Sequence, residues 1–425
     1  MHPTRNFTFS CLALVMLIGL SGQVFASTVT VGLCPGPGTH YTSIQLAVNA
    51  VAPGSTVKVC PGPYPEQVTI NKTLTLIGIA SGTQDAAVVT VPSGGLVTNG
   101  VTDIFGFPTA AQIFVHDATA VTISHLAVDG ANDGMTGCSI DPIGIYYQNA
   151  SGTITYNAVR NVLLPPALQG CQDGLAINVE SNTGNPPVTI SNNSVRNYDK
   201  NGITASGLGN GTGGPNVTVT GNTVIGMGAI TTTAQNGIQI SYGATGTVAS
   251  NHVADDIYIP PPDCAPCYGA SGILIYASES VTVSSNTVES TQYGIVPASD
   301  PTYGTANFTV IKLNRVGGTQ NYDGIDLCSD KNTAQSNVIY GSAQSGIHVD
   351  GECSPSAGVN NTVSGNTINE ACAGILLGTG TPNTIGSNVF SNVTNTTLAG
   401  DTCTPLDGPT EKHQSLRPSP YKMKN

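Results

Sequence analysis

The chain has 425 residues, 9% of them charged, and a formal net charge of −12 at pH 7. An acidic chain without a basic patch interleaved with aromatic residues is not expected to bind nucleic acid. Disorder is also excluded, because disordered chains carry more charge and fewer β-branched residues. The composition therefore predicts a rigid protein with a surface of Asn, Thr, Ser and Gly.

Residues 1–26 have the pattern of a secretory signal peptide. Arg5 precedes an apolar run at residues 11–20, and Val-Phe-Ala stands directly before Ser27. The run is too short to span a bilayer comfortably, and no later segment of the sequence approaches that length. We therefore expect cleavage near Ala26 and a monomeric, exported chain, extracellular or periplasmic, without membrane insertion.

Residues 41–52 are predicted to form an amphipathic helix, because the apolar residues of this segment fall on one helical face. These residues are Ile44, Ala47, Val48 and Val51. No stretch after residue 55 keeps an apolar stripe at helical spacing for three turns. The rest of the chain is therefore not expected to be helical.

A dipeptide of Gly followed by Ile or Leu recurs nine times from residue 144 onward, at spacings of 22 to 35 residues. Self-similarity at such a period indicates a solenoid. Short runs such as residues 217–219 and 281–283 alternate with period two, which is a strand signal. The dipeptides begin at Gly144, Gly174, Gly202, Gly237, Gly272, Gly294, Gly324, Gly346 and Gly374.

A second repeat places Asn after an apolar residue and two variable residues. In a parallel coil, one Asn amide can bond the next Asn one turn away and satisfy the backbone of a bend. The repeat therefore predicts stacked turns with a structural Asn ladder. Its members are Asn157, Asn193, Asn222, Asn251, Asn286 and Asn366, with variants at Asn314 and Asn337.

These repeats resemble the right-handed parallel β-helix proteins of the pectin-lyase-like superfamily, over roughly residues 40–395. The segment with Gly62, Tyr64, Glu66, Val68 and Ile70 matches the superfamily's entry stretch. The resemblance implies an all-β, single-stranded solenoid of roughly a dozen turns, with the helix at 41–52 capping its N-terminal end. The expected domains are a β-helix at 27–400 and a flexible polar, basic tail at 401–425.

Ten cysteines remain after the signal peptide, and an even number in an exported chain favours disulfides. Sequence neighbours are spatial neighbours in a solenoid, so we expect consecutive pairing. Cys264 and Cys267 form the single C-x-x-C of the chain. It is interpreted as a clip that stiffens a loop, with a redox or metal role as the alternative.

Candidate chemistry follows from the register of the repeat. If the Ile after each Gly points inward, the next residue and the one two positions later point outward. The first outward column reads Tyr146, Ala176, Thr204, Gln239, Leu274, Val296, Asp326, His348 and Leu376. The second reads Gln148, Asn178, Ser206, Ser241, Tyr276, Ala298, Cys328, Asp350 and Gly378.

The two columns place Asp326 beside His348 on adjacent turns, with Asp350 about 7 Å along the strand. Asp323 lies at the bend just before Asp326. These residues could perform general acid/base work on a glycosidic bond. Two alternatives stay open: a Ca²⁺ site, or a solvated acidic patch without function. No other cofactor is expected.

Residues 321–330 resemble the N-T-D-G-I-D stretch of polygalacturonases, which implies that Asp323 is a catalytic acid. The remaining motifs of that family are missing, because Gln344 and Ser345 stand where paired aspartates are expected. The chain has no Trp, so sugar stacking would use Tyr. Candidate substrate-binding residues are Tyr276, Gln239, Tyr258 and Tyr268.

The sequence therefore predicts an exported β-helix that binds or processes extracellular polysaccharide. If it is an enzyme, the expectation is a glycoside hydrolase that uses Asp323, Asp326, His348 and Asp350, with a polysaccharide lyase as a further possibility. The alternative is a non-catalytic, adhesin-like rod. A third interpretation, from resemblance, is a periplasmic factor for copper-site assembly, and the lack of Met and His clusters disfavours it.

Overall fold

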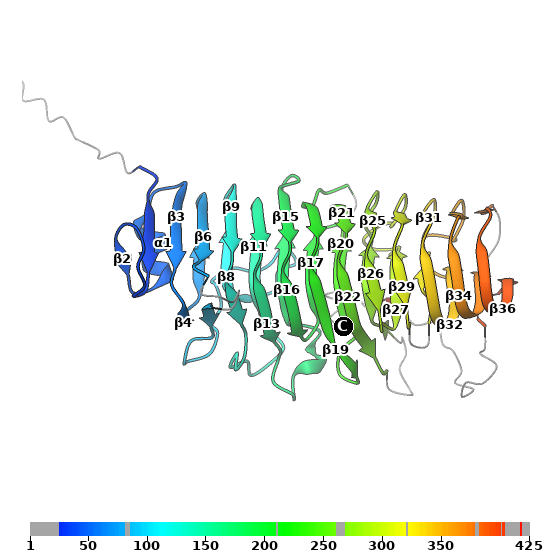
Figure 1. The fold of residues 1–425 in the computed structure, drawn as a ribbon, viewed down its shortest axis with the longest axis horizontal. Helices are drawn as coiled ribbons and strands as arrows, with labels where there is room; N and C mark the ends of the chain where they lie inside the picture. The colour runs from blue at the N-terminus through cyan, green and yellow to red at the C-terminus, as the bar shows by residue number, and fades with distance from the viewer. Residues whose placement is uncertain are drawn as a thin grey trace, which may run out of the picture.

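The computed structural model describes residues 25–80, 86–209, 211–260, 268–319, 322–378, 382–400, 402–403 and 417–418. Within these ranges the chain winds into one long coil, with successive turns stacked along its axis (Figure 1). Nearly all of the predicted signal peptide and most of the predicted tail lie outside the described residues. No helix among the described residues is long and apolar enough to cross a membrane.

Two long sheets form the walls of the coil, and all pairings between their strands are parallel among the described residues. The first sheet consists of β1 (Thr28–Val31), β2 (His40–Tyr41), β3 (Ser55–Val59), β6 (Leu74–Gly78), β9 (Val121–Ser124), β12 (Gly152–Thr155), β15 (Pro187–Ser191), β18 (Asn216–Thr220), β21 (Thr245–Ala249), β25 (Thr282–Ser284), β28 (Val310–Lys312), β31 (Thr333–Gln335), β33 (Thr362–Ser364) and β35 (Thr384–Ile385).

The second sheet carries the Gly-Ile repeat. It consists of β4 (Gly62–Pro65), β5 (Val68–Ile70), β7 (Ala87–Thr90), β8 (Thr109–His116), β10 (Ala127–Asp129), β11 (Asp141–Gln148), β13 (Ala158–Val162), β14 (Leu175–Glu180), β16 (Ser194–Tyr198), β17 (Asn201–Ser206), β19 (Thr223–Ile230), β20 (Asn236–Ser241), β22 (His252–Tyr258), β24 (Ser271–Tyr276), β26 (Thr287–Glu289), β27 (Tyr293–Ala298), β29 (Arg315–Gly317), β30 (Ile325–Asp326), β32 (Val338–Val349), β34 (Thr367–Leu377) and β36 (Val389–Ala399). Two short strands, β23 (Tyr268–Gly269) and β37 (Arg417–Pro418), pair separately.

The core is a column of aliphatic side chains inside the coil. Each inward Ile of the repeat pairs with the Ile of the next turn and belongs to one buried apolar cluster. The all-β class and the parallel coil that the sequence predicted are therefore confirmed. The column reads Ile145, Ile177, Ile203, Ile238, Ile273, Ile295, Ile325, Ile347 and Ile375.

The register corrects one turn of the prediction. Ile145 pairs with Ile177, so the stacked position on that turn is Ile177 rather than Leu175. Ala176 points into the main core instead of outward. Asn178 therefore belongs to the first outward column, and Glu180 takes the place of Asn178 in the second.

The Gly of the repeat is required because the turns approach one another closely. A Cβ on Gly237 would lie 2.3 Å from Val253 Cγ1 and 2.7 Å from the carbonyl oxygen of Gly272. We expect Gly237→Ala to destabilise the fold by about 1–3 kcal/mol, since overpacking forces backbone shifts. Gly94→Ala is the control, because a Cβ there meets no atom within 4 Å. Equal thermal midpoints for the two variants would contradict this explanation.

The Asn repeat forms the predicted ladder. Asn251 Nδ2 donates to Asn286 Oδ1 at 3.0 Å and to the Val219 carbonyl at 2.9 Å. Its Oδ1 accepts from the backbone N and from Nδ2 of Asn222, both at 2.9 Å. The same pattern continues from Asn157 to Asn388. The ladder is structural, as the sequence predicted.

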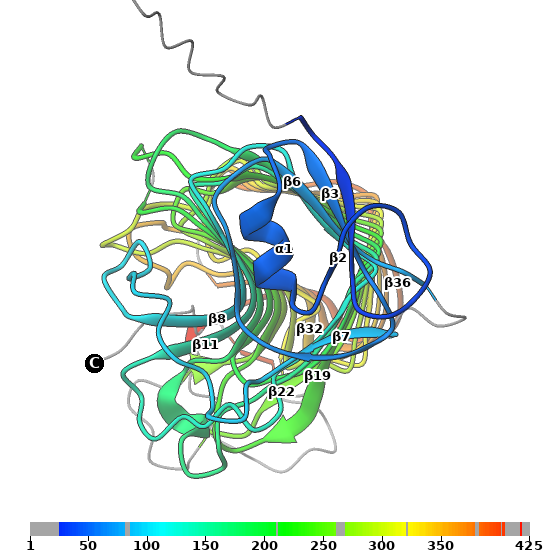
Figure 2. The same ribbon diagram turned by 90° about the vertical axis from the view of Figure 1, so that its left-hand side faces the viewer.

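The entry segment forms helix α1 (Ile44–Ala50), which lies across the near end of the coil in Figure 2. Ile44, Ala47 and Val48 are buried in the core. The Glu66 carboxylate of the entry stretch accepts from the backbone N of Ile44 and of Gln45, at 2.8 and 2.9 Å. The capping role of α1 and the number of turns stay predictions.

Disulfides connect consecutive cysteines, as predicted. The pairs are Cys34–Cys60, Cys138–Cys171, Cys328–Cys353 and Cys372–Cys403. The predicted Cys264–Cys267 clip lies outside the described residues. The chain is thus clipped near its N-terminal end, along the outer face and near the last turns.

Candidate functional site

The outward columns of the second sheet are covered rather than exposed. The members of the first column, corrected for register, are all buried. Two segments help to cover them. Phe105, from residues 99–107, and Tyr303, from residues 299–305, pack against a buried cluster that includes Leu274 and Val296 of the column. The rings of both also contact Tyr242. The candidate functional groups are therefore polar side chains that lie beneath these covering segments.

Glu180 is one such covered group. Its carboxylate accepts from Tyr146 Oη at 2.7 Å, Asn178 Nδ2 at 3.0 Å and the Ile104 backbone N at 3.3 Å. Burial, the largest influence, raises the pKa of Glu180 from 4.5 to about 7, although these hydrogen bonds oppose the rise. The folded protein therefore keeps a proton that the unfolded chain releases between these pH values.

We expect stability to fall as pH rises from about 4.5 to about 7, and Glu180→Gln to remove up to about 3 kcal/mol of this fall. The Asn178 amide can rotate to accept from the new Gln, because its Oδ1 has no hydrogen bond among the described residues. Chemical denaturation at pH 5 and pH 8 measures the difference. The control is Glu289→Gln at a half-exposed carboxylate. Equal pH slopes for wild type and Glu180→Gln would contradict the prediction.

Two of the predicted substrate-binding residues, Gln239 and Tyr276, lie on the paired strands β20 and β24 and are both buried. Gln239 is fully buried and bonds Asn201, Asn236 and Ser241. Tyr276 is buried and donates from its Oη to Asp300. Neither side chain is presented at the surface, so contact with a ligand would require the covering segments to move. Their binding roles stay predictions.

Tyr258 precedes the C-x-x-C segment in the sequence, and Tyr268 directly follows it. Tyr258 ends β22, and its side chain is half-buried. Tyr268 begins β23, and its side chain is outside the part of the chain that the structure describes. The binding roles of Tyr258 and Tyr268 therefore stay predictions.

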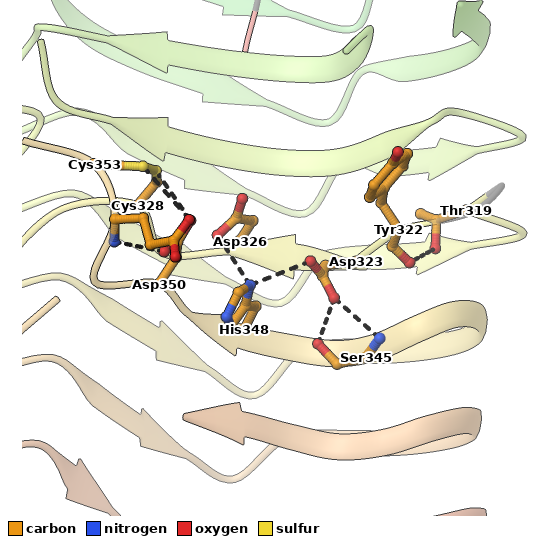
Figure 3. Close-up of polar contacts among 10 residues, drawn as sticks. Thr319, Tyr322, Asp323, Asp326, Cys328, Ser345, His348, Asp350 and Cys353 are labelled. Carbon is orange, nitrogen blue, oxygen red and sulfur yellow. Dashed lines mark hydrogen bonds and ion pairs between the residues drawn. A yellow bond between two sulfur atoms is a disulfide. The ribbon is translucent and has the colours of Figure 1, made fainter. Parts of the chain in front are cut away.

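The predicted acidic cluster does form. β30 pairs with β32 so that Ile325 and Ile347 point inward while Asp326 lies opposite His348 on the outer face. Asp323 lies at the bend just before β30, and Asp350 directly follows β32. The period-two register of two neighbouring turns therefore brings all four residues to one place (Figure 3).

Three of these side chains converge. His348 Nδ1 lies 3.4 Å from Asp323 Oδ2 and 3.9 Å from Asp326 Oδ1. Donor atoms of Asp323, Asp326 and His348 all lie within 4.8 Å of one another. The three side chains are only 2–7% exposed. In Figure 3 both carboxylates point toward the imidazole.

Burial and charge set the protonation of the cluster. Burial alone would lower the pKa of His348, but the neighbouring Asp323, Asp326 and Asp350 together raise it to about 10. Burial, followed by the charge of Asp350, raises the pKa of Asp326 well above its ordinary value, against the opposing effect of His348. The imidazole is thus cationic at neutral pH, and burial favours the protonated form of Asp326.

Asp350 occupies the edge of the cluster, against a disulfide. Its Oδ2 lies 3.5 Å from Cys328 Sγ and 3.6 Å from Cys353 Sγ, while Oδ1 accepts from the Glu352 backbone N at 2.7 Å. Burial raises the pKa of Asp350, and the charge of His348 opposes this rise. Asp350 is half-buried, so it is the most accessible of the four residues.

Sequence reasoning missed the residues that support the cluster. The Ser345 backbone N and Oγ both donate to Asp323 Oδ1, at 3.0 and 2.6 Å. Tyr322 stacks on Tyr293 with ring centroids 4.6 Å apart. Ser345 directly precedes Gly346, so its position in the repeat could have revealed it. No local pattern marks Tyr293 and Tyr322 as a pair, because they lie on different turns.

A cavity of about 380 Å³ lies away from this cluster. It is lined by Thr90, Val91, Pro92, Ser93, Asp129, Ala131 and Asn132. Asp129 already accepts from Arg160 Nε and Asn161 Nδ2, both at 2.9 Å. No convergent acid/base set lines this cavity, so the buried cluster around His348 is the better candidate for chemistry.

Two family descriptions match the sequence. Residues 111–312 match "Right handed beta helix region", and residues 268–422 match "Periplasmic copper-binding protein (NosD)". The first match and the parallel coil of the structure agree on a right-handed parallel β-helix fold. The second match spans the candidate cluster. No curated protein matches the chain.

Solved structures that are similar to this chain include enzymes that act on carbohydrates. A family GH136 lacto-N-biosidase from Eubacterium ramulus has a TM-score of 0.56 and 11% identity, with 87% of this chain and 67% of that chain covered. A family 28 exopolygalacturonase from Yersinia enterocolitica has a TM-score of 0.51 and 12% identity, with coverage of 82% and 74%. The A-module of a mannuronan C-5 epimerase from Azotobacter vinelandii has a TM-score of 0.48 and 14% identity, with coverage of 86% and 95%. At these identities the likeness concerns the fold alone.

Proposed function

We propose that this protein is exported and hydrolyses an extracellular polysaccharide at the cluster of Asp323, Asp326, His348 and Asp350. The observation that carries the proposal is the convergence of two carboxyl groups on one buried imidazole across two neighbouring turns. A purely structural rod gives no reason for such convergence, because uncompensated buried charge is costly. The predicted signal peptide and the disulfides support export.

The proposed reaction is hydrolysis with the four residues in separate roles. Asp326 gives its proton to the glycosidic oxygen, and the half-buried Asp350 takes a proton from the attacking water, whose oxygen joins the anomeric carbon. Asp323, fixed by Ser345, orients the His348 imidazolium. The positive imidazolium and the protonated Asp326 keep the charge of the cluster low enough to remain buried.

A role in copper-site assembly does not follow from the second family match. Residues 268–422 contain no Met and only two His, at His348 and His413. The cysteines of this range form the pairs Cys328–Cys353 and Cys372–Cys403. Soft thiolate and thioether ligands, which select copper(I), are therefore missing from the matched segment.

The test is a reducing-sugar and unsaturated-product assay of the purified exported protein on neutral and acidic polysaccharides, with and without Ca²⁺. An Asp326→Asn/His348→Ala double variant removes the cluster, and His252→Ala removes an exposed His–carboxylate pair as the control. Release that is lost only in the double variant supports the proposal. Release that persists there shows an enzyme with another site. No release from any substrate, with a native circular dichroism spectrum, favours a non-catalytic rod.

A further inference from the structure

The donor atoms of Asp323, Asp326 and His348 have the spacing of a metal site. His348 Nδ1 lies 3.4 Å from Asp323 Oδ2 and 3.9 Å from Asp326 Oδ1. Ligand atoms around a tetrahedral Zn²⁺ lie about 3.3–3.6 Å apart, given metal–ligand bonds of about 2.0–2.2 Å. A separation of 3.4 Å is long for a hydrogen bond between N and O. The spacing of the three atoms therefore fits coordination of one shared cation better than direct hydrogen bonds between the side chains.

A second observation also points to a ligand. Asp326 Oδ1 is buried, faces His348 in Figure 3 and has no hydrogen-bond partner among the described residues. The Asp326 side chain is only 5% exposed. An unpaired buried carboxylate oxygen is costly. A cation bound between the three side chains would satisfy it.

Ser345 orients one of the ligands from behind. Its backbone N and its Oγ both donate to Asp323 Oδ1, at 3.0 and 2.6 Å. The other oxygen, Oδ2, is thereby turned toward His348 (Figure 3). Metal sites in proteins commonly fix their ligating carboxylates in this way. Asp323 is thus held in position before any ion arrives.

We propose that Asp323, Asp326 and His348 bind one divalent transition-metal ion of the Zn²⁺ class. One imidazole nitrogen and two carboxylate oxygens suit Zn²⁺ and similar ions. Ca²⁺, the alternative raised by the sequence, prefers oxygen ligands alone. Three protein ligands leave a fourth position for water or another small ligand. Binding itself does not depend on the proposed hydrolysis.

One consequence of this site does rest on the proposed function. An ion bound to Asp326 takes the place of the proton that the hydrolysis requires, as metal ions do at carboxylate and His ligands. Zn²⁺ is therefore expected to inhibit the enzyme. Removal of the ion with a chelator should restore the activity. The site would then act as a metal-sensitive control on the same four residues.

The test is isothermal titration of the metal-stripped full chain with ZnCl₂ and, separately, with CaCl₂. We expect one equivalent of Zn²⁺ and no comparable Ca²⁺ binding. His348→Ala should abolish the Zn²⁺ isotherm, and His252→Ala should leave it unchanged as the matched control. Ser345→Ala, which keeps all three ligands, should weaken binding about 10–100-fold. Zn²⁺ binding that survives His348→Ala overturns the proposal.

A measurement on the wild type alone guards against variants that fail to fold. Co²⁺ added to the metal-stripped protein should give the intense visible absorption of tetrahedral cobalt, and one equivalent of Zn²⁺ should remove it. No such absorption and no Zn²⁺ isotherm overturn the proposal. Neither readout needs a substrate. The metal-site proposal can therefore be overturned even if hydrolysis is observed, and it can be supported even if no hydrolysis is observed.

Discussion

Asp326→Asn is expected to lower polysaccharide hydrolysis about 10²–10⁴-fold, the usual contribution of a positioned general acid. Asn has nearly the same shape as the protonated carboxyl, but it cannot give a proton to the leaving oxygen. Burial raises the pKa of Asp326 well above its ordinary value, which favours the protonated form that a general acid needs. The substitution therefore removes the proton donor while it keeps the size and shape of the side chain.

Two controls separate this effect from a loss of structure. Glu352→Gln changes an exposed carboxylate two residues beyond Asp350 and should keep the rate within about threefold, since exposed surface charges contribute little. The thermal midpoint of Asp326→Asn should stay close to that of the wild type, because Asn has nearly the same size and shape as the carboxyl group that it replaces. A rate unchanged by Asp326→Asn would remove Asp326 from the acid role.

The architecture could be predicted from the sequence because the repeat is local. The Gly-Ile dipeptides and the Asn ladder show which side chains of each turn point inward. Once the inward Ile is known on two neighbouring turns, the residues that follow it are known to lie beside each other on the outer face. Asp326 and His348 were found in this way. The same reasoning was wrong at Ala176. The residue that stacks on Ile145 is Ile177, two positions after the Leu of the Gly174-Leu175 dipeptide, and a shift of two residues leaves the period-two alternation unchanged.

The covered state of the outer face could not be predicted, because it depends on contacts between distant segments. Phe105 reaches Tyr242, and Ile104 donates its backbone N to Glu180 from 76 residues away. Nothing in the local pattern of residues 99–107 shows where this segment lies. The burial of Gln239 and Tyr276 therefore depends on contacts that the repeat does not encode.

Support for the candidate site is likewise non-local. The Asp323 carboxylate depends on Ser345, 22 residues later, and the two residues meet only because one turn stacks on the next. Polygalacturonases are expected to have paired aspartates at that place, whereas this chain has Gln344 and Ser345. Ser345 does not supply a carboxylate at this place. It instead donates a hydrogen bond to the carboxylate of Asp323.

The second large effect is expected in the fold itself, at the Asn ladder. Asn251→Ala should destabilise the protein by roughly 3–5 kcal/mol, because each buried partner left without a hydrogen bond costs about 1–3 kcal/mol. The variant removes the acceptor of the Asn222 backbone N and Nδ2 and the donor to the Val219 carbonyl and Asn286 Oδ1. Asn286 Oδ1 keeps one bond, from the backbone N of residue 251. Side-chain packing changes little, since the Asn side chain is small. The loss of folding stability in this variant should therefore measure the contribution of the ladder hydrogen bonds.

Asn388→Ala is the matched control near the other end of the same ladder. Asn388 accepts from Asn366 N and Nδ2, at 2.9 and 3.0 Å, and donates to the Val363 and Gly386 carbonyls, so it also makes four ladder contacts. It is partly exposed, whereas Asn251 is 2% exposed. Water can replace the lost bonds at Asn388, and its substitution should cost about 1 kcal/mol. Thermal midpoints measured under one condition compare the two variants. Equal losses would show that burial does not set the strength of the ladder, and that its bonds act only through the local bend of each turn.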